Sequence, residues 1–309
     1  MNKVLKSLCQ VHSPSGEEIH MKNFLLNYIH ANSCTWKAKP KIVHGEGFLD
    51  CLILIFGNPK IAAIAHMDTT GFTVRYQDQL IPIGGPEVIG GETLKGVDEL
   101  GEIECSLDLN EEGQLHYKFG RAISSGTNLV FKSPFEEDQF YYYAPYLDNR
   151  IGIYNLLKLA ENLENGALVF SCWEEHGGGT IPFLVKFLYE DFQINKMLIS
   201  DITWATDGIS IGDGVVISYR DRNIPRKSFI HKITELAIKN NIPFQIEVEA
   251  YGSSDAREIQ QSPYPIDWSF IGPPVENPHS NKEKISKKDL DAMTRFYGLL
   301  FHQLELRNF

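Results

Sequence analysis

Short, strongly apolar segments alternate along this chain with segments of helical spacing. CLILIFG (51–57) and KIAAIAH (60–66) are predicted to be buried strands that are joined by a tight turn. GALVFSCW (166–173) and KMLISDI (196–202) repeat the pattern further along. Strands that alternate with helices are typical of a mostly parallel sheet covered by helices. We therefore predict an α/β fold. Further strands are expected at 215–219, 245–251 and 265–272.

Segments with helical apolar spacing lie before, between and after these strands. Ser15 and Glu18 have the spacing of a capping box, in which each side chain satisfies an N–H at the helix start. This pair predicts the beginning of a helix at 16–31. The expected helices are 2–12, 16–31, 149–162, 180–190, 225–240 and 285–306.

The pattern changes between about residues 71 and 143. Short alternating segments such as FTVRY, GEIECSLDL and TNLVF are separated there by glycine-rich breaks such as IGG and NEEG. Such segments predict a small β-rich domain, a barrel or a sandwich, inserted into the α/β body. We expect a discontinuous catalytic domain, 1–70 and 144–309, and an inserted domain, 71–143.

Composition limits the possible partners and the cellular location. The chain has 309 residues and a formal net charge of −11, which disfavours binding to nucleic acid or to an anionic membrane. No apolar stretch approaches the roughly 20 residues of a membrane span, and the N-terminus lacks the pattern of a signal peptide. The five cysteines are odd in number and form no C-x-x-C pair. We expect a cytoplasmic protein with reduced cysteines.

Metal-binding side chains follow, or close, the predicted strands. The carboxyl ends of the strands in an α/β sheet are where such folds build their sites. Singly, each residue has an ordinary alternative: a loop histidine, a helix-capping aspartate or a solvated acidic pair. Their repetition in one local setting suggests a two-metal hydrolase site. The candidates are His66, Asp148, Glu174, Glu175, Asp201 and His279.

His66 ends a predicted strand and is followed by Asp68. In an extended segment, residues two apart face the same side. Asp68 could therefore accept the second imidazole N–H and fix the tautomer of a metal-bound histidine. The adjacent Glu174 and Glu175 repel each other, and burying them requires cations or strong donors. In a two-metal site, one would bind metal and the other would take a proton from water.

The chain also contains a rival hydrolase pattern. Gly208 to Gly212 reads G-x-S-x-G around Ser210, and residues 176–179 read HGGG, like an esterase oxyanion loop. With Asp255 and His279 following, the order suits a serine hydrolase. However, a nucleophilic serine needs a strand before it and a helix after it. The flanking sequences TWATD and GDGVVISYRD instead predict a loop that leads into a strand.

The chain contains S-P-S-G-E near its N-terminus, followed by the motifs H-M-D, L-D-N-R-I-G, E-E-x-G, S-D-I-T and P-H-S. Together these motifs resemble those of the tetrahedral co-catalytic metallo-aminopeptidases, the glutamyl or deblocking aminopeptidase family. The resemblance extends from Pro14 to the last helix and includes YGSSDA (251–256). Departures are Thr69, where the family has an acidic residue, and His176 with the glycine run that follows it. We expect these departures from the family pattern to change substrate specificity and assembly size, and to leave the metal site intact.

The resemblance implies roles for the candidate residues. Two divalent ions would be bound, most readily Zn²⁺ with Co²⁺ or Mn²⁺ as substitutes, and Glu174 would be the general base acting on a water between them. It also implies peptide substrates, a cis peptide after Asp148, and a homo-oligomer of as many as twelve subunits. A non-catalytic peptide-binding relative is an alternative, disfavoured because the ligand set is complete. By position, the ligands would be His66 and Asp201 on one ion, Glu175 and His279 on the other, and Asp148 on both.

Overall fold

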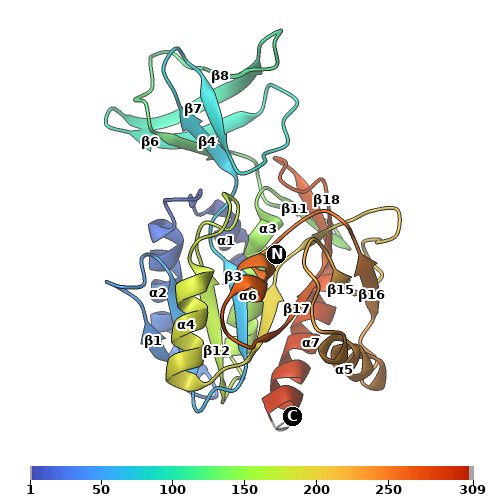
Figure 1. Ribbon diagram of the computed structural model, residues 1–309. Helices are drawn as coiled ribbons and strands as arrows, with labels where there is room; N and C mark the ends of the chain where they lie inside the picture. Colours follow the sequence, from blue (N-terminus) through green and yellow to red (C-terminus); the bar gives the residue numbers. More distant parts are fainter. Residues whose placement is uncertain (1, 306–309) are drawn as a thin grey trace.

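The centre of the α/β body is an eight-stranded, mostly parallel sheet (Figure 1). The computed structural model describes residues 2–305. The strand order is β1-β2-β12-β3-β13-β17-β15-β16, with antiparallel pairing at β1-β2, β2-β12 and β17-β15. β2, β3 and β12 are buried along their whole length, which explains their continuous apolar sequences. The strands are β1 (Lys41–Val43), β2 (Leu52–Phe56), β3 (Ala62–His66), β12 (Gly166–Ser171), β13 (Lys196–Ser200), β15 (Val215–Arg220), β16 (Phe244–Val248) and β17 (Asp267–Gly272).

Helices cover both faces of this sheet. α3 connects β3 to β12, and α4 connects β12 back past β3 to β13. Because parallel crossovers are right-handed, connections that run in opposite directions place their helices on opposite faces. Consistent with this, α3 packs with α1 and α7, whereas α4 packs with α6. The helices are α1 (Lys3–Gln10), α2 (Ile19–Asn32), α3 (Leu147–Ala160), α4 (Ile181–Phe192), α5 (Lys227–Lys239), α6 (Ala256–Gln261) and α7 (Lys287–Glu305), with a short 3-10 turn η1 (Ser33–Thr35).

The expected β-rich insert is a six-stranded antiparallel sheet with its own hydrophobic core. Figure 1 shows it standing on the α/β body. Its core includes Phe72 and Phe131, and Tyr146 at the start of α3 stacks on Phe131 from the body. The strand order is β5-β4-β9-β6-β7-β8, with β4 (Gly71–Val74), β5 (Leu80–Ile83), β6 (Thr93–Asp98), β7 (Gly101–Leu109), β8 (Leu115–Lys118) and β9 (Asn128–Phe131).

A third, five-stranded sheet joins segments that are far apart in the sequence. Its order is β10-β11-β19-β18-β14. β11 leads directly into the segment of Asp148, β14 follows Asp201, and His279 lies between β18 and β19. This small sheet therefore brings three of the candidate ligands toward one another. Its strands are β10 (Glu136–Glu137), β11 (Tyr141–Ala144), β14 (Thr203–Trp204), β18 (Pro274–Glu276) and β19 (Glu283–Ser286).

The capping box expected at α2 does not form. The helix begins at Ile19, and the Ser15 hydroxyl instead donates to Oδ2 of Asp68 at 2.6 Å. The Glu18 carboxylate accepts the main-chain N–H groups of Gly16 and Trp173. Both side chains are used by tertiary contacts, which the local spacing could not indicate.

Candidate metal centre

The predicted ligands lie where the sheet geometry places them. His66 is the last residue of β3, and Asp201 directly follows β13, its parallel neighbour. Asp148 lies at the start of α3, and the peptide bond between Asp148 and Asn149 is cis, as the resemblance implies. The three side chains therefore meet at one edge of the sheet. His66, Asp148 and Asp201 present ligand atoms that all lie within 4.8 Å of one another.

The Asp148 carboxylate lies between two imidazoles. Its Oδ1 is 3.2 Å from Nε2 of His66, and its Oδ2 is 3.2 Å from Nε2 of His279. Asp148, Glu175 and His279 form a second group of ligand atoms within 4.8 Å of one another. Asp148 is thus the common member of two potential cation sites. Burial opposes ionisation of this carboxyl, but contacts with His279 and His66 hold its pKa well below the ordinary value.

The other ring nitrogen of each histidine faces a main-chain carbonyl. Nδ1 of His66 lies 3.2 Å from the carbonyl oxygen of Asp68, and Nδ1 of His279 lies 3.0 Å from that of Gly85. The Asp68 carboxylate is slightly farther from Nδ1 of His66, at 3.5 Å. A carbonyl accepts the Nδ1 proton and so leaves Nε2 as a lone-pair donor. Both imidazoles are therefore oriented as metal ligands, with Nε2 directed at Asp148.

Asp68 holds the paired glutamates in place. Its Oδ1 accepts the N–H of Glu174 at 3.1 Å, and its Oδ2 accepts the N–H of Glu175 at 3.0 Å. The Glu175 side chain is 4% exposed and lies 3.5 Å from Nε2 of His279. The Glu174 side chain is 18% exposed and lies 3.9 Å from Nε2 of His66. The pair thus divides into one buried carboxylate at a ligand position and one that opens to the cavity.

The electrostatics of the cluster are those of a site with too much negative charge. Burial raises the pKa of Glu174 well above its ordinary value, that of Glu175 to about 8, and that of Asp201 to about 6. Burial lowers the pKa of His66 and His279, but the carboxylates outweigh it and raise them, to about 10 for His279. Without metal the cluster must hold protons. Divalent cations would replace them, and imidazole nitrogen with carboxylate oxygen is a donor set that suits such ions.

Glu283 is a site residue that the sequence did not reveal. It is 1% exposed and lies in β19. Its Oε2 accepts the N–H of Asp148 at 3.0 Å, and its Oε1 accepts the N–H of His279 at 2.8 Å. One side chain therefore ties together the backbones of two ligands that are far apart in the sequence. Glu283 lies in a charged, helix-like stretch, KEKISKKDL, where no local signal marks a buried carboxylate.

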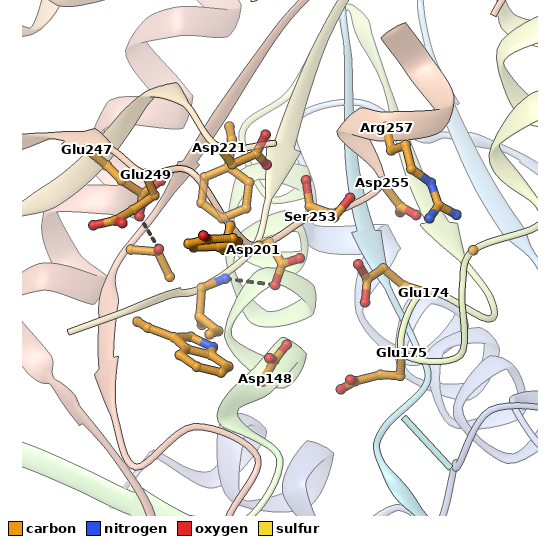
Figure 2. A pocket seen from close by; sticks show the side chains of 18 of the residues that line it. Asp148, Glu174, Glu175, Asp201, Asp221, Glu247, Glu249, Ser253, Asp255 and Arg257 are labelled. Atoms are coloured by element: carbon orange, nitrogen blue, oxygen red, sulfur yellow. Dashed lines mark hydrogen bonds between the residues drawn. The ribbon is translucent and has the colours of Figure 1, made fainter. Parts of the chain in front are cut away.

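The cluster opens into a cavity of about 520 Å³. Figure 2 shows Glu174 and Glu175 on one side of it, with Asp148 and Asp201 in the middle. Ser210 is not among the lining residues; it is exposed and lies in a turn with no helix directly after it. The serine-hydrolase hypothesis is therefore not supported. All seven predicted site residues, in contrast, come together here: His66, Asp68, Asp148, Glu174, Glu175, Asp201 and His279.

The α/β body, its β-rich insert and this site together define a metal-dependent aminopeptidase. The sequence pattern of the M42 glutamyl aminopeptidase family matches residues 114–296, and the chain belongs to this family. Within residues 2–305, no helix combines the length and apolar character needed to cross a bilayer.

Individual relatives agree with this assignment. The chain is 29% identical over 281 residues to a putative aminopeptidase from Acetivibrio thermocellus, covering 75% of this chain and 79% of that protein. It is 21% identical over 347 residues to the putative aminopeptidase FrvX of Escherichia coli K12, with 94% and 92% covered. Its fold is similar to that of a TET aminopeptidase from the archaeon Thaumarchaeota archaeon SCGC AB-539-E09, with a TM-score of 0.86, 19% identity, and 98% and 96% covered.

Proposed function

We propose that the aminopeptidase site is dinuclear. His66 and Asp201 would hold one divalent ion, Glu175 and His279 would hold the other, and Asp148 would contact both. The observation that carries this proposal is the Asp148 carboxylate, whose two oxygens each lie 3.2 Å from Nε2 of a different histidine. A carboxylate that bridges two cations needs this arrangement.

The donor set favours Zn²⁺, with Co²⁺ or Mn²⁺ as substitutes. When bound, such ions polarise the scissile carbonyl and lower the pKa of water, which supplies the nucleophile at neutral pH. The protein provides the ligand geometry and the cavity that admits the N-terminal residue of a peptide. We propose peptides with a free N-terminus as the substrates.

We assign Glu174 as the general base and Asp68 as the residue that positions it. Glu174 would accept a proton from the attacking water and deliver it to the leaving amine. Its side chain is 18% exposed, against 4% for Glu175, so Glu174 is the member of the pair that a water in the cavity can reach. Asp68 fixes the main chain of both glutamates through their N–H groups.

The substitution Glu174→Gln tests this assignment. It should retain bound metal and lose nearly all turnover of aminoacyl-p-nitroanilides. Glu235→Gln, the same change on the exposed face of α5, is the matched control and should keep full turnover. Metal content is measured after dialysis. Wild-type turnover in Glu174→Gln would show that another group is the base.

The substitution Asp148→Ala tests the dinuclear arrangement. It should reduce bound metal from two equivalents to nearly none, because both ions lose a ligand. A variant that still binds two equivalents would contradict the bridging role of Asp148.

We also infer a cytoplasmic homo-oligomer, with a dodecamer as the first candidate. Two similar solved structures are described as a dodecamer and as a Pyrococcus horikoshii peptidase that can assemble into a tetrahedron or a large octahedral shell. In this chain, Ile246 and Val248 of the edge strand β16 are 46% and 65% exposed, and such apolar surface suits a subunit interface. All five cysteines are unpaired, which agrees with a reducing compartment. Sedimentation analysis would reveal a monomer if the assembly proposal is wrong.

A further inference from the structure

We propose that the cavity wall opposite Glu174 and Glu175 recognises a positively charged N-terminal side chain, that of lysine or arginine. This inference rests on the proposed aminopeptidase site and specifies its substrate class. The wall, which we call the acidic wall, consists of Asp221, Glu247 and Glu249. Figure 2 shows these three residues across the cavity from Glu174 and Glu175.

The acidic wall and the metal cluster line one continuous cavity. Asp221 directly follows β15, Glu247 lies in β16, and Glu249 directly follows β16. Trp204 connects the two ends: it lines the same cavity, and its ring lies 5.8 Å from that of His279 in an edge-on arrangement. A substrate residue whose carbonyl is held at the metal cluster would therefore extend its side chain toward this wall.

The carboxylates of the acidic wall have no cationic partner within residues 2–305. Glu247 is 6% exposed, and the hydrogen bond to its Oε1 comes from a neutral group, the Thr203 hydroxyl. Arg220 is nearby, but its Nε donates to the main-chain carbonyls of Asp221 and Glu249, each at 3.2 Å. Burial raises the pKa of Asp221 and Glu247, and at Asp221 this effect outweighs the opposing charge of the neighbouring Arg220.

A count of charges in the cavity points to the same ligand. Nine lining residues are acidic, whereas the basic ones are Arg257 and His279. Four of the nine belong to the metal cluster, and Glu258 forms an ion pair with Arg257. Asp255 and the three residues of the acidic wall form no ion pair within residues 2–305; Arg220, which does not line the cavity, lies close enough to Asp221 to lower its pKa. Two divalent ions would balance only the metal cluster, which leaves the acidic wall available to a cation supplied by the substrate.

Asp255 provides an independent indication that this cavity takes a cation. Its side chain is 2% exposed, its Oδ2 accepts the Ser171 hydroxyl at 2.7 Å, and its Oδ1 has no hydrogen-bond partner within the described residues. An unpaired carboxylate oxygen beside a cavity is costly unless a donor arrives. Asp255 lines the cavity near Glu174.

The uncharged part of the lining suits a long aliphatic chain with a cationic end. Trp204 and Tyr251 are 51% and 83% exposed at this cavity. The methylene stem of lysine or arginine packs well on aromatic rings, which also attract its charge. A glutamate side chain, in contrast, would be repelled by the acidic wall. The chain should therefore not prefer the N-terminal residue that its family name suggests.

Lysine and norleucine form a matched pair for the test, because they share the same methylene stem and differ in the terminal ammonium. We expect the metal-loaded protein to hydrolyse lysyl-p-nitroanilide with a kcat/KM about tenfold to hundredfold above that of norleucyl-p-nitroanilide, the value of one charge-assisted contact. Glu247→Gln should lower this ratio to nearly one. Asp221→Asn should lower it in the same direction. A wild-type ratio near one, or a preference for glutamate, would overturn the proposal.

The failure of this inference can be distinguished from the failure of the proposed function. If no aminoacyl substrate is hydrolysed with Zn²⁺, Co²⁺ or Mn²⁺, the dinuclear peptidase proposal fails. The acidic wall is then tested by calorimetric binding of free L-lysine and L-norleucine to the metal-loaded protein. Tighter binding of L-lysine that is lost in Glu247→Gln supports recognition of a cation, and equal affinities refute it.

Discussion

Helix α3 and strand β13 approach each other closely at Gly152, and this contact sets the spacing of two proposed metal ligands. A Cβ atom added at Gly152 would lie 2.0 Å from the Ser200 carbonyl oxygen and 2.2 Å from Oδ1 of Asn149. Ser200 precedes Asp201, and Asn149 follows Asp148. An alanine at position 152 must therefore push Asp148 and Asp201 apart.

The size of the displacement and its effect on stability follow from the distance between the added Cβ atom and the Ser200 carbonyl oxygen. Ordinary van der Waals contact begins at 3.4 Å, so the helix and the strand must separate by about 1.4 Å, the difference from 2.0 Å. Overpacking of this kind costs about 1–3 kcal/mol, and the obstructing atom belongs to the backbone and cannot rotate away. Alanine gains at most about 1 kcal/mol in helix propensity, so we expect a net loss of stability. Distances between a metal ion and its ligands tolerate errors of only about 0.2 Å, so the loss of metal affinity should be larger than the loss of stability.

Urea unfolding and bound-metal analysis of Gly152→Ala check this reasoning. The control is Gly298→Ala in α7, where an added Cβ would meet no atom within 4 Å. The control should be as stable as wild type or slightly more stable, with full metal content. If Gly152→Ala matches wild type in both stability and bound metal, the close approach does not determine the ligand spacing.

Three further predictions concern buried carboxylates. Asp68→Ala should destabilise the protein by about 1–3 kcal/mol and reduce turnover, because the two N–H groups of the glutamate pair lose their acceptor; unchanged unfolding and kinetics would contradict it. Glu283→Ala leaves the N–H groups of Asp148 and His279 without an acceptor. Urea unfolding should therefore show a loss of stability similar to that of Asp68→Ala, and metal analysis should show weaker binding of metal. A variant with wild-type metal affinity would refute this. Burial raises the pKa of Glu18 from 4.5 to about 7, so its protonated form stabilises the fold below about pH 4.5 and this contribution is lost as the pH rises through 7. The unfolding free energy of the wild type should fall between pH 5 and 8, and Glu18→Gln should reduce this fall by up to about 3 kcal/mol. Parallel pH profiles of the wild type and Glu18→Gln would disprove the raised pKa of Glu18.

The sequence by itself indicated the α/β fold and the candidate ligands, because both depend on local patterns. His66 and Asp201 could be found because each adjoins an apolar strand, and the strand ends of an α/β sheet converge at one edge. The adjacent Glu174 and Glu175 were recognisable because two neighbouring carboxylates after a buried strand require compensation.

The tertiary structure decided which groups support these residues and what surrounds them. Ser15 and Glu18 have the spacing of a helix cap, but long-range contacts recruit both side chains. Glu283 is recognisable as a site residue only after β19 pairs with β11 and β18. The acidic wall likewise forms because β15 and β16 pair across the sheet. Strand pairing over long sequence separations is set by the packing of the whole chain, so no local pattern of residues could have encoded these neighbours.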